Sequence, residues 1–315
     1  MQKDQLTEQF AADVLKGLSA TPKFLLSKYF YDDIGSKLFG EIMQLPEYYL
    51  AKAEFEIFST QSTQIVSSIS QPFHVIELGP GNGLKTKLFL KKALEEKKML
   101  SYYPIDISQD ALDVLSKNIL TDLKVEIHPL ASEYMNGLEL LAKVNGNKLI
   151  LFMGSNIGNF SHDETVRFFL SLYTLMNKGD HFMIGFDLKK DPELILAAYN
   201  DSKGVTRAFN LNLLHRMNRE LGANFDVVNF KHYPTYDPRS GEARSYLISE
   251  KKQTVYMGPL HKEFFFAKDE AIYMEVSRKY EVNDIENYAT AAGLKMVKDF
   301  KDCKHYFSEA LFIKE

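Results

Sequence analysis

Through the middle of the chain, short apolar runs alternate with longer segments in which apolar and charged residues follow a helical period. Runs that predict strands are 75–78, 101–108, 124–130, 148–154 and 180–188, and segments that predict helices are 84–97, 111–120, 138–144 and 163–176. Strands separated by helices pair in parallel through right-handed crossovers. The pattern therefore predicts a doubly wound α/β sheet whose ligand lies at the carboxyl ends of the strands.

The pattern changes after Asp187. Helical segments and then strand-like stretches follow, at 192–200, 208–221, 225–237, 243–257 and 263–280. This change predicts an inserted α+β domain. Beyond it, the chain returns to a helix at 282–293 and then to two strands, 294–302 and 306–314, which are suited to close the first sheet as an antiparallel edge.

We therefore expect three parts in this chain. Residues 61–190 and 281–315 form the sheet domain, residues 191–280 form an inserted substrate-binding domain, and residues 1–60 form an N-terminal helical segment that packs with the inserted domain. A chain of 315 residues that is 45% hydrophobic has enough apolar material for one large domain or two ordinary ones.

Three glycines at alternate positions follow the first strand, in the stretch Glu77-Leu78-Gly79-Pro80-Gly81-Asn82-Gly83. Glycine allows a sharp turn and a close approach of a ligand to the main chain, and the helix that follows directs its first N–H groups to the same place. A tight strand-to-helix turn without a ligand is the alternative. The glycines thus indicate a ligand-binding loop without proving one.

An acidic residue, Asp106, ends the second predicted strand, 29 residues after Glu77. A carboxylate at this place can accept hydrogen bonds from both ribose hydroxyls of an adenosine cofactor. The alternative role is to cap the following helix, and Ser108 could fill that role equally well.

Composition and charge exclude several classes of function. Lys and Arg number 38 against 42 Asp and Glu, without a basic stretch interleaved with aromatic residues, so we expect no nucleic-acid partner. The N-terminus lacks an apolar signal region and no run is long enough to cross a bilayer, so we expect a cytoplasmic protein with no membrane contact. A single cysteine, Cys303, excludes an intramolecular disulfide framework and a cysteine-ligated cluster. The eight histidines show no close metal-ligand spacing, so we expect no metal, although a site assembled from distant residues stays open.

An adenosine-binding sheet could carry NAD or S-adenosylmethionine. The spacing G-x-G-x-G departs from the dinucleotide fingerprint G-x-G-x-x-G, and no hydride-accepting constellation is evident. An antiparallel pair at the C-terminal end suits methyltransferases. S-adenosylmethionine is therefore the expected cofactor.

Several long segments resemble the histidine-specific Nα-methyltransferases, which trimethylate the α-amine of histidine in ergothioneine biosynthesis. The matching segments are 28–58, 77–86, 152–160, 198–226 and 274–280, in order across nearly the whole chain. The resemblance implies a Rossmann-like class I methyltransferase sheet, S-adenosylmethionine as cofactor, L-histidine as substrate and its betaine, hercynine, as product. We expect the enzyme to act as a monomer.

The resemblance also implies roles for individual residues in cofactor binding. Gly79, Lys85 and Asp106 match positions that bind S-adenosylmethionine, with Asp106 at the ribose. Near the adenine the family has an Asp-Phe pair, and the best match here is Glu133-Tyr134, which differs from that pair in both residues.

For the amino-acid substrate, the matching positions are Tyr48, Asn159, Tyr199, Glu275 and Ser277, with Tyr31 and Phe39 as walls of the same pocket. Read from the residues alone, Asn159 could simply form a turn and each tyrosine could simply pack. Glu275 and Ser277 lie two apart in a strand-like stretch and share a face, so they could hold both imidazole nitrogens. Alternatively they form a solvated polar face paired with Arg278 or Lys279.

Methyl transfer depends more on alignment of the reacting atoms than on a dedicated base. We therefore assign no residue as a catalytic acid or base, and we expect Tyr48, Asn159 and Tyr199 to orient the substrate. Asn159 and Tyr199 should hold the substrate carboxylate, and Arg207 and Arg244 are the next candidates for that role. Two other functions stay open: methylation of another amino acid or a modified histidine, and a catalytically silent module that keeps the cofactor pocket.

Overall fold

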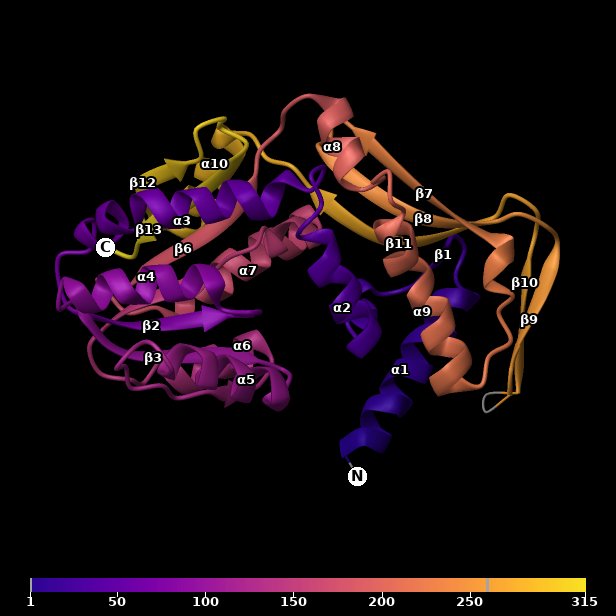
Figure 1. The fold of residues 1–315 in the computed structure, drawn as a ribbon, viewed down its shortest axis with the longest axis horizontal. Coiled ribbons are helices and arrows are strands. Elements are labelled where there is room, and N and C mark those ends of the chain that lie inside the picture. Colours follow the sequence, from indigo (N-terminus) through magenta and orange to yellow (C-terminus); the bar gives the residue numbers. More distant parts are fainter. Residues whose placement is uncertain (1, 259–260) are drawn as a thin grey trace. The chain divides into compact units, whose positions relative to one another are not determined.

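The computed structural model describes residues 2–258 and 261–315, with side chains described from residue 7 onward. The chain forms two compact units, and Figure 1 shows their elements. Unit 1 comprises Met1–Tyr49 and Lys190–Ser277, and unit 2 comprises Leu50–Lys189 and Arg278–Glu315. The first boundary lies at residue 49 rather than the expected 60, because helix α3 (Tyr49–Ser67) buries Ile57 and Phe58 in a core cluster of unit 2.

Unit 2 is built on one seven-stranded sheet. Its strands are β2 (Phe73–Leu78), β3 (Met99–Asp106), β4 (Leu130–Ala131), β5 (Asn147–Phe152), β6 (His181–Asp187), β12 (Lys295–Lys301) and β13 (Phe307–Ile313). Their order is β12-β13-β6-β5-β2-β3-β4. The pairs among β2 to β6 are parallel, whereas β13 is antiparallel to both β6 and β12. The predicted doubly wound sheet with an antiparallel C-terminal edge is confirmed.

Helices cover both faces of this sheet. Successive residues of a strand point to opposite faces, and β2 carries apolar side chains on both, so each face needs a covering layer. Phe73 and Val75 of β2 pack in a cluster with α3, α4 (Leu84–Glu95) and α5 (Gln109–Leu120). Ile76 and Leu78 pack in another cluster with α6 (Tyr134–Leu141), α7 (His162–Leu175) and α10 (Val282–Ala292). Unit 2 is therefore a three-layer α/β/α structure with two apolar cores.

One predicted strand of unit 2 was too long. Of the expected strand 124–130, only Leu130–Ala131 pairs regularly with β3, and Ile127 contributes an isolated bridge to Tyr102. Pro129 interrupts this stretch, and a proline has no N–H to donate to a ladder. The segment therefore forms only a short edge strand.

Unit 1 combines helices with a four-stranded sheet of order β1-β11-β8-β7 and a two-stranded sheet of β9 and β10. The elements are α1 (Gln2–Ser19), β1 (Lys23–Phe24), η1 (Ser27–Phe30), α2 (Asp33–Ile42), α8 (Pro192–Ala198), α9 (Val205–Leu221), η3 (Val227–Asn229), β7 (Phe230–Asp237), β8 (Glu242–Ser249), β9 (Gln253–Met257), β10 (Lys262–Phe266) and β11 (Ala271–Arg278). The stretches 243–257 and 263–280 each divide into two strands. Lys23 of β1 pairs in parallel with Ile272 of β11, so the N-terminal segment supplies an edge strand to the inserted sheet.

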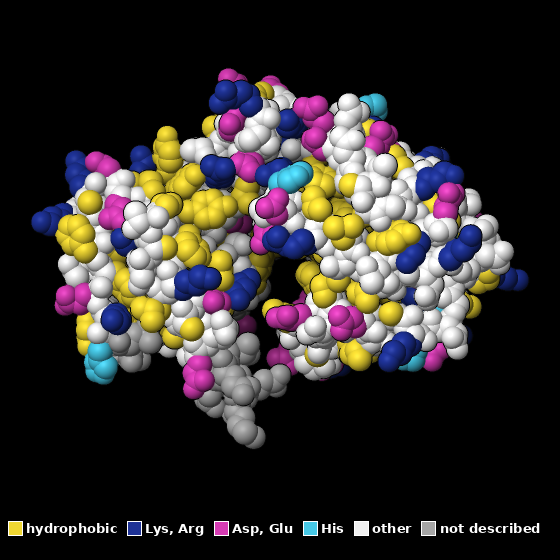
Figure 2. Space-filling model, turned by 180° about the vertical axis from the view of Figure 1, so that it is seen from behind, with side chains coloured by type: hydrophobic (Ala, Val, Ile, Leu, Met, Phe, Trp, Pro, Cys, Tyr) yellow, Lys and Arg dark blue, Asp and Glu magenta, His cyan; other side chains and the backbone are white. Residues whose placement is uncertain are grey.

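Charges are mixed on the surface. On the face in Figure 2, basic and acidic side chains are interspersed and neither sign forms a continuous patch, consistent with 38 basic and 42 acidic residues in the chain. Among the described residues, no helix combines the length and the apolar character needed to cross a membrane.

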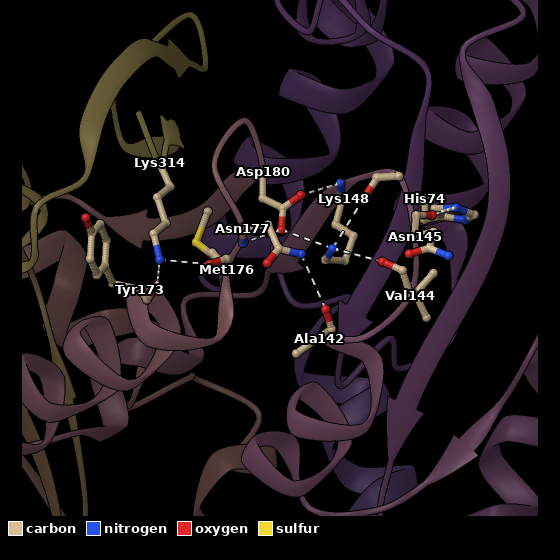
Figure 3. A network of polar contacts seen from close by, with 11 residues as sticks. His74, Ala142, Val144, Asn145, Lys148, Tyr173, Met176, Asn177, Asp180 and Lys314 are labelled. Atoms are coloured by element: carbon tan, nitrogen blue, oxygen red, sulfur yellow. Dashed lines mark hydrogen bonds and ion pairs between the residues drawn. The ribbon is translucent and has the colours of Figure 1, made fainter.

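A buried ion pair holds the amino ends of β5 and β6 (Figure 3). Lys148 Nζ lies 3.2 Å from Asp180 Oδ2, and both side chains are 1% exposed. Asp180 also accepts hydrogen bonds from the backbone N–H groups of Lys148 and Asn177, each at 2.8 Å. Removing either partner would leave an unpaired buried charge, so this end of the sheet is rigidly fixed.

A second buried carboxyl, Glu77, joins β2, β3 and α4 at the carboxyl end of the sheet. It accepts hydrogen bonds from Thr86 Oγ1 at 2.8 Å and from the Tyr102 hydroxyl at 2.5 Å. Burial raises the pKa of Glu77 from 4.5 to about 7, although both hydroxyls and Lys85 lower it. Glu77 thus fixes the start of the glycine loop and takes up a proton near neutral pH.

We predict that this carboxyl makes the stability of the fold depend on pH. Between pH 4.5 and about 7 the unfolded chain loses the Glu77 proton before the folded chain does, so the free energy of unfolding falls as the pH rises. The full shift corresponds to roughly 3 kcal/mol. Glu77→Gln cannot ionise and should lose this part of the pH dependence, as measured by denaturant unfolding from pH 4.5 to 8.

Glu139→Gln, which replaces an exposed carboxyl of α6, is the matched control and should keep the slope of the original protein. Parallel curves for Glu77→Gln and the original protein over this pH range would show that Glu77 has no raised pKa.

Candidate functional site

The glycine loop has a backbone that only glycine adopts without strain. Gly79, Gly81 and Gly83 have φ values of +67°, +56° and +71°, all in the left-handed region. A Cβ on Gly79 would lie 2.5 Å from the Tyr134 hydroxyl, whereas a Cβ on Gly81 would meet nothing within 4 Å. The loop is therefore tightly held at its start and open at its middle, where a ligand can approach the main chain.

This loop lies where the strand order reverses. From β2 the chain proceeds to β3 on one side, and it later adds β5 on the other side of β2. The loops that follow β2 and β5 therefore lead away in opposite directions, and sheets of this topology usually bind their ligands at the carboxyl ends of these two strands.

The loop after β5 is held by contacts within unit 2. Ser155 is buried, has a φ of +58° and accepts a hydrogen bond on Oγ from the Asp187 N–H at 3.1 Å. The Tyr280 hydroxyl donates to the Ile157 carbonyl at 3.1 Å. This loop ends in the short helix η2 (Asn156–Asn159), whose last residue, Asn159, is exposed. The predicted substrate residue Asn159 thus lies in unit 2, on a fixed loop beside the glycine loop's strand.

Asp106 ends β3, as predicted. Its Oδ1 accepts a hydrogen bond from the Ser108 N–H at 2.9 Å. Ser108 Oγ accepts from the Ala111 N–H at 3.2 Å and is the N-cap of α5. The capping role that could have explained Asp106 therefore belongs to Ser108.

Tyr134 links the glycine loop with Asp106. Its hydroxyl lies over Gly79, and burial together with the charge of Asp106 raises the pKa of Tyr134 to about 12. Its ring meets Phe152 edge-on, with 5.7 Å between centroids. Glu133, by contrast, is an exposed N-cap residue of α6 whose side chain makes no capping hydrogen bond. The preceding residue, Ser132, donates its N–H to the Asp106 carbonyl at 2.9 Å, so both residues of the predicted adenine pair follow directly on the end of β3.

Lys85 lies in the first turn of α4 and forms an ion pair with Glu54 of α3. Glu54 is 2% exposed and also accepts a hydrogen bond from the Gly154 N–H at 2.7 Å. Glu54 was not among the residues predicted from the sequence. Its helical neighbours Ala53, Ile57 and Phe58 are buried, so a glutamate among them was the signal that could have found it.

In unit 1, two predicted substrate residues meet. The Tyr199 hydroxyl, at the end of α8, donates to Ser277 Oγ of β11 at 2.7 Å. Glu275 lies two residues before Ser277 on the same strand, so the two side chains share one face. Ser277 is 8% exposed, which contradicts the alternative of a solvated polar face at this position. Lys279 does not support that alternative either, because it is fully buried in unit 2 in an ion pair with Asp187, 2.7 Å away.

The predicted aromatic walls also come together in unit 1. Tyr31 and Phe39 meet edge-on with 5.5 Å between ring centroids, and Phe39 lies 6.3 Å from Tyr48. Phe209 of α9 contacts both Tyr31 and Phe39, at 5.6 and 5.9 Å. Phe209 was not predicted as a site residue, although its spacing of four residues from Leu213, and of four more from Leu213 to Met217, indicates a buried helix face.

The two arginines considered for the substrate carboxylate have other surroundings. Arg244 donates to Glu242 of the same strand. Arg207 lines a cavity of about 570 Å³ in unit 1, together with Asn200, Asp201, Ser202, Lys203, Gly204, Val228, Phe230, Lys231, His232 and Glu250. The predicted substrate residues of unit 1 are not among them, so this cavity is separate from the aromatic and Tyr199–Ser277 groups.

One cluster among the described residues brings metal-ligand atoms together. It consists of Glu56, Asp302 and Cys303, with ligand atoms within 4.8 Å of one another. However, Glu56 accepts a hydrogen bond from the Cys303 N–H, and Asp302 accepts from the Tyr306 and Phe307 N–H groups, each at 2.7 Å. These carboxylates anchor a loop, and the absence of a metal stays a prediction.

Comparison with known proteins identifies the family. The family described as "Histidine-specific methyltransferase, SAM-dependent" matches residues 10–314. A histidine N-alpha-methyltransferase of Mycobacterium tuberculosis is 33% identical over 291 residues, covering 92% of this chain and 90% of that protein. One from Mycolicibacterium smegmatis is 32% identical over 312 residues, covering 99% and 97%.

A fungal relative extends the comparison. Ergothioneine biosynthesis protein 1 of Neurospora crassa is 30% identical over 286 residues, which are 89% of this chain but 32% of that longer protein. The family match spans nearly the whole chain and includes the glycine loop, Asp106 and both segments of each unit. The chain therefore belongs to the S-adenosylmethionine-dependent, histidine-specific methyltransferase family.

Proposed function

We propose that this protein trimethylates the α-amine of L-histidine and releases the betaine, hercynine. One observation carries the proposal: a left-handed glycine loop, followed by a carboxylate at the end of the adjacent strand, in a chain whose family is histidine-specific. The named relatives, histidine N-alpha-methyltransferases and an ergothioneine biosynthesis protein, support both the substrate and the pathway.

The residues present fit S-adenosylmethionine. Gly81 leaves open space where any other residue would place a Cβ, and Asp106 and Tyr134 lie at the same end of the sheet. Asp106 would hold the ribose, the glycine loop would approach the amino-acid part, and Lys85 would offer a cation to its carboxylate. When bound, the cofactor supplies a methyl group on a sulfonium that is ready for displacement.

The chain's own contribution is chiefly orientation. In-line displacement needs the amine lone pair aligned with the methyl carbon, and alignment is worth several orders of magnitude in rate. Asn159 and Tyr199 are neutral donors, so they can bind a carboxylate without adding positive charge near a sulfonium. Glu275 and Ser277 would hold the imidazole. The single Tyr199 O–H donates to Ser277 Oγ in this structure, and it would turn to the carboxylate when the substrate binds, with Ser277 then donating to the Tyr199 oxygen.

The amine must be neutral to attack, and a nearby sulfonium disfavours its protonated form. The final product carries a quaternary ammonium group. The faces of Tyr31, Phe39 and Tyr48 can stabilise such a cation. No residue is required as a strong base in this scheme.

One experiment distinguishes this function from the two alternatives, methylation of another amino acid or a modified histidine and a catalytically silent module. With S-adenosylmethionine and a pool of amino acids, mass spectrometry identifies which compound gains methyl groups. Methylation of a different amino acid supports the alternative substrate, and unchanged amino acids together with retained cofactor binding support a silent module. The monomeric state and the cytoplasmic location stay predictions.

We predict that Asp106→Ala weakens S-adenosylmethionine binding by about 1.5–3 kcal/mol, the usual value of hydrogen bonds to a charged group. Isothermal titration calorimetry measures this directly. Asp110→Ala, which removes an exposed carboxylate from the first turn of α5, is the matched control and should bind normally. Unaltered affinity of Asp106→Ala would refute the ribose assignment.

A second prediction concerns the imidazole. Phenylalanine should be methylated with a kcat/KM lower by on the order of 10⁴-fold than that of histidine, because it leaves the polar groups of the site unpaired. Glu275→Ala should lower kcat/KM for histidine, whereas Glu263→Ala, an exposed glutamate on β10, should not. Glu275 has no part in recognition if its alanine variant works as well as the original enzyme.

A third prediction concerns the carboxylate. Histamine lacks this group and should lose both affinity and alignment, and a misplacement of about 1 Å costs on the order of 100-fold in rate. Asn159→Ala and Tyr199→Phe should each narrow the difference in kcat/KM between histidine and histamine. Asn118→Ala, on the exposed face of α5, is the control.

Equal kcat/KM values for both compounds on the original enzyme would mean that the carboxylate is not recognised. If histamine is discriminated but both variants discriminate normally, the carboxylate is bound elsewhere, and Arg207→Ala and Arg244→Ala are the next variants to test.

A further inference from the structure

A single buried carboxylate connects the two segments that follow the neighbouring strands β2 and β5. Glu54 of α3 accepts a hydrogen bond on Oε1 from the Gly154 N–H, at 2.7 Å, in the loop after β5. Its Oε2 forms the ion pair with Lys85, which lies in the first turn of the helix after the glycine loop. One side chain from outside the sheet therefore holds the segments that follow β5 and β2.

A second buried glutamate lies beside Glu54 in unit 2. This residue, Glu309, in the middle of β13, is completely buried, and burial together with the charge of Glu54 raises the pKa of Glu309 well above its usual value. Burial therefore favours the protonated form of Glu309. A buried carboxylate is stable only when it is paired and hydrogen-bonded, and Lys85 and the Gly154 N–H meet both needs of Glu54.

Both segments held by Glu54 need an external support. Gly154 and Ser155 have φ values of +80° and +58°, so the loop after β5 leaves its strand through two left-handed residues. A left-handed conformation is costly for a residue such as Ser155 and persists only where surrounding contacts enforce it. Lys85 is 26% exposed, so its ammonium can reach solvent or a ligand while one side faces Glu54.

We propose that Glu54 is a positioning residue for the methyl-transfer reaction. It sets the direction of the Lys85 ammonium toward the cofactor and fixes the start of the loop that ends in Asn159. This inference rests on the proposed function for the identity of the ligands, but its main test is cofactor binding, which is measured without any methyl acceptor.

The experiment compares Glu54→Gln and Glu54→Ala with the control Glu56→Gln on the same helix. Glutamine has the shape of glutamate, and its amide oxygen can still accept from the Gly154 N–H, so Glu54→Gln removes the charge pair alone. Each variant is characterised by its Tm, by calorimetric titration with S-adenosylmethionine, and by kcat and KM for histidine.

Glu54→Gln should bind S-adenosylmethionine about tenfold more weakly, and Glu54→Ala should in addition lower kcat by about tenfold or more, because loop placement affects alignment. Glu56→Gln should match the original protein in both. In a Lys85→Met background, the effect of Glu54→Gln on binding should largely disappear, because the two residues act through one contact. A purely structural glutamate would lower Tm without this coupling.

The proposal is overturned if Glu54→Gln binds the cofactor within about twofold of the original protein, or if its effect multiplies with that of Lys85→Met. Should Glu54→Ala fail to fold, Glu54→Gln and the double variant still decide. If the original protein binds S-adenosylmethionine but leaves histidine unmethylated, the substrate assignment fails. The binding measurements on the Glu54 variants still test the positioning role of Glu54.

Discussion

The reversal of strand order beside β2 is the constraint on which the rest of unit 2 depends. Because β3 and β5 lie on opposite sides of β2, the loops after β2 and β5 must leave the sheet in different directions. This divergence of the two loops follows from the strand order alone, before any side chain is considered. The residue types add two further features. Gly79, Gly81 and Gly83 have no side chain that would keep a ligand from the main chain, and Asp106 places a carboxylate at the end of the next strand.

Buried ionisable groups fix the positions of the segments at the carboxyl end of the sheet, at a cost in stability. Glu77 fixes the start of the glycine loop through Thr86 and Tyr102, and Glu54 holds the start of α4 and the loop after β5. Apolar residues of similar size could pack at least as stably, since charges lose their hydration on burial. Carboxylates can, however, fix the direction of an N–H or an ammonium, which apolar residues cannot. The Lys148–Asp180 pair serves a comparable purpose at the other end, where its contacts are to backbone alone.

Unit 1 is organised differently, because most of its predicted substrate residues lie on separate helices and strands. Tyr199 ends a helix and Ser277 lies in a strand, yet their hydroxyls are hydrogen-bonded. The aromatic group of Tyr31, Phe39 and Tyr48 comes from the N-terminal segment and packs on Phe209 of α9. The N-terminal segment belongs to this unit because β1 extends its sheet at β11. In the proposed function, recognition of the substrate would therefore depend on residues from both segments of this unit, Met1–Tyr49 and Lys190–Ser277.

The sequence by itself determined the doubly wound sheet, its antiparallel edge, the glycine loop and Asp106. These follow from local rules: the period of apolar residues, the need for glycine where φ is positive, and the arrangement of parallel strand ends. Only the tertiary structure decided that α3 belongs to unit 2, that Glu54 pairs with Lys85 across 31 residues, and that Tyr199 meets Ser277 across 78. No local pattern encodes such contacts, because the partners are brought together by the packing of whole helices and strands.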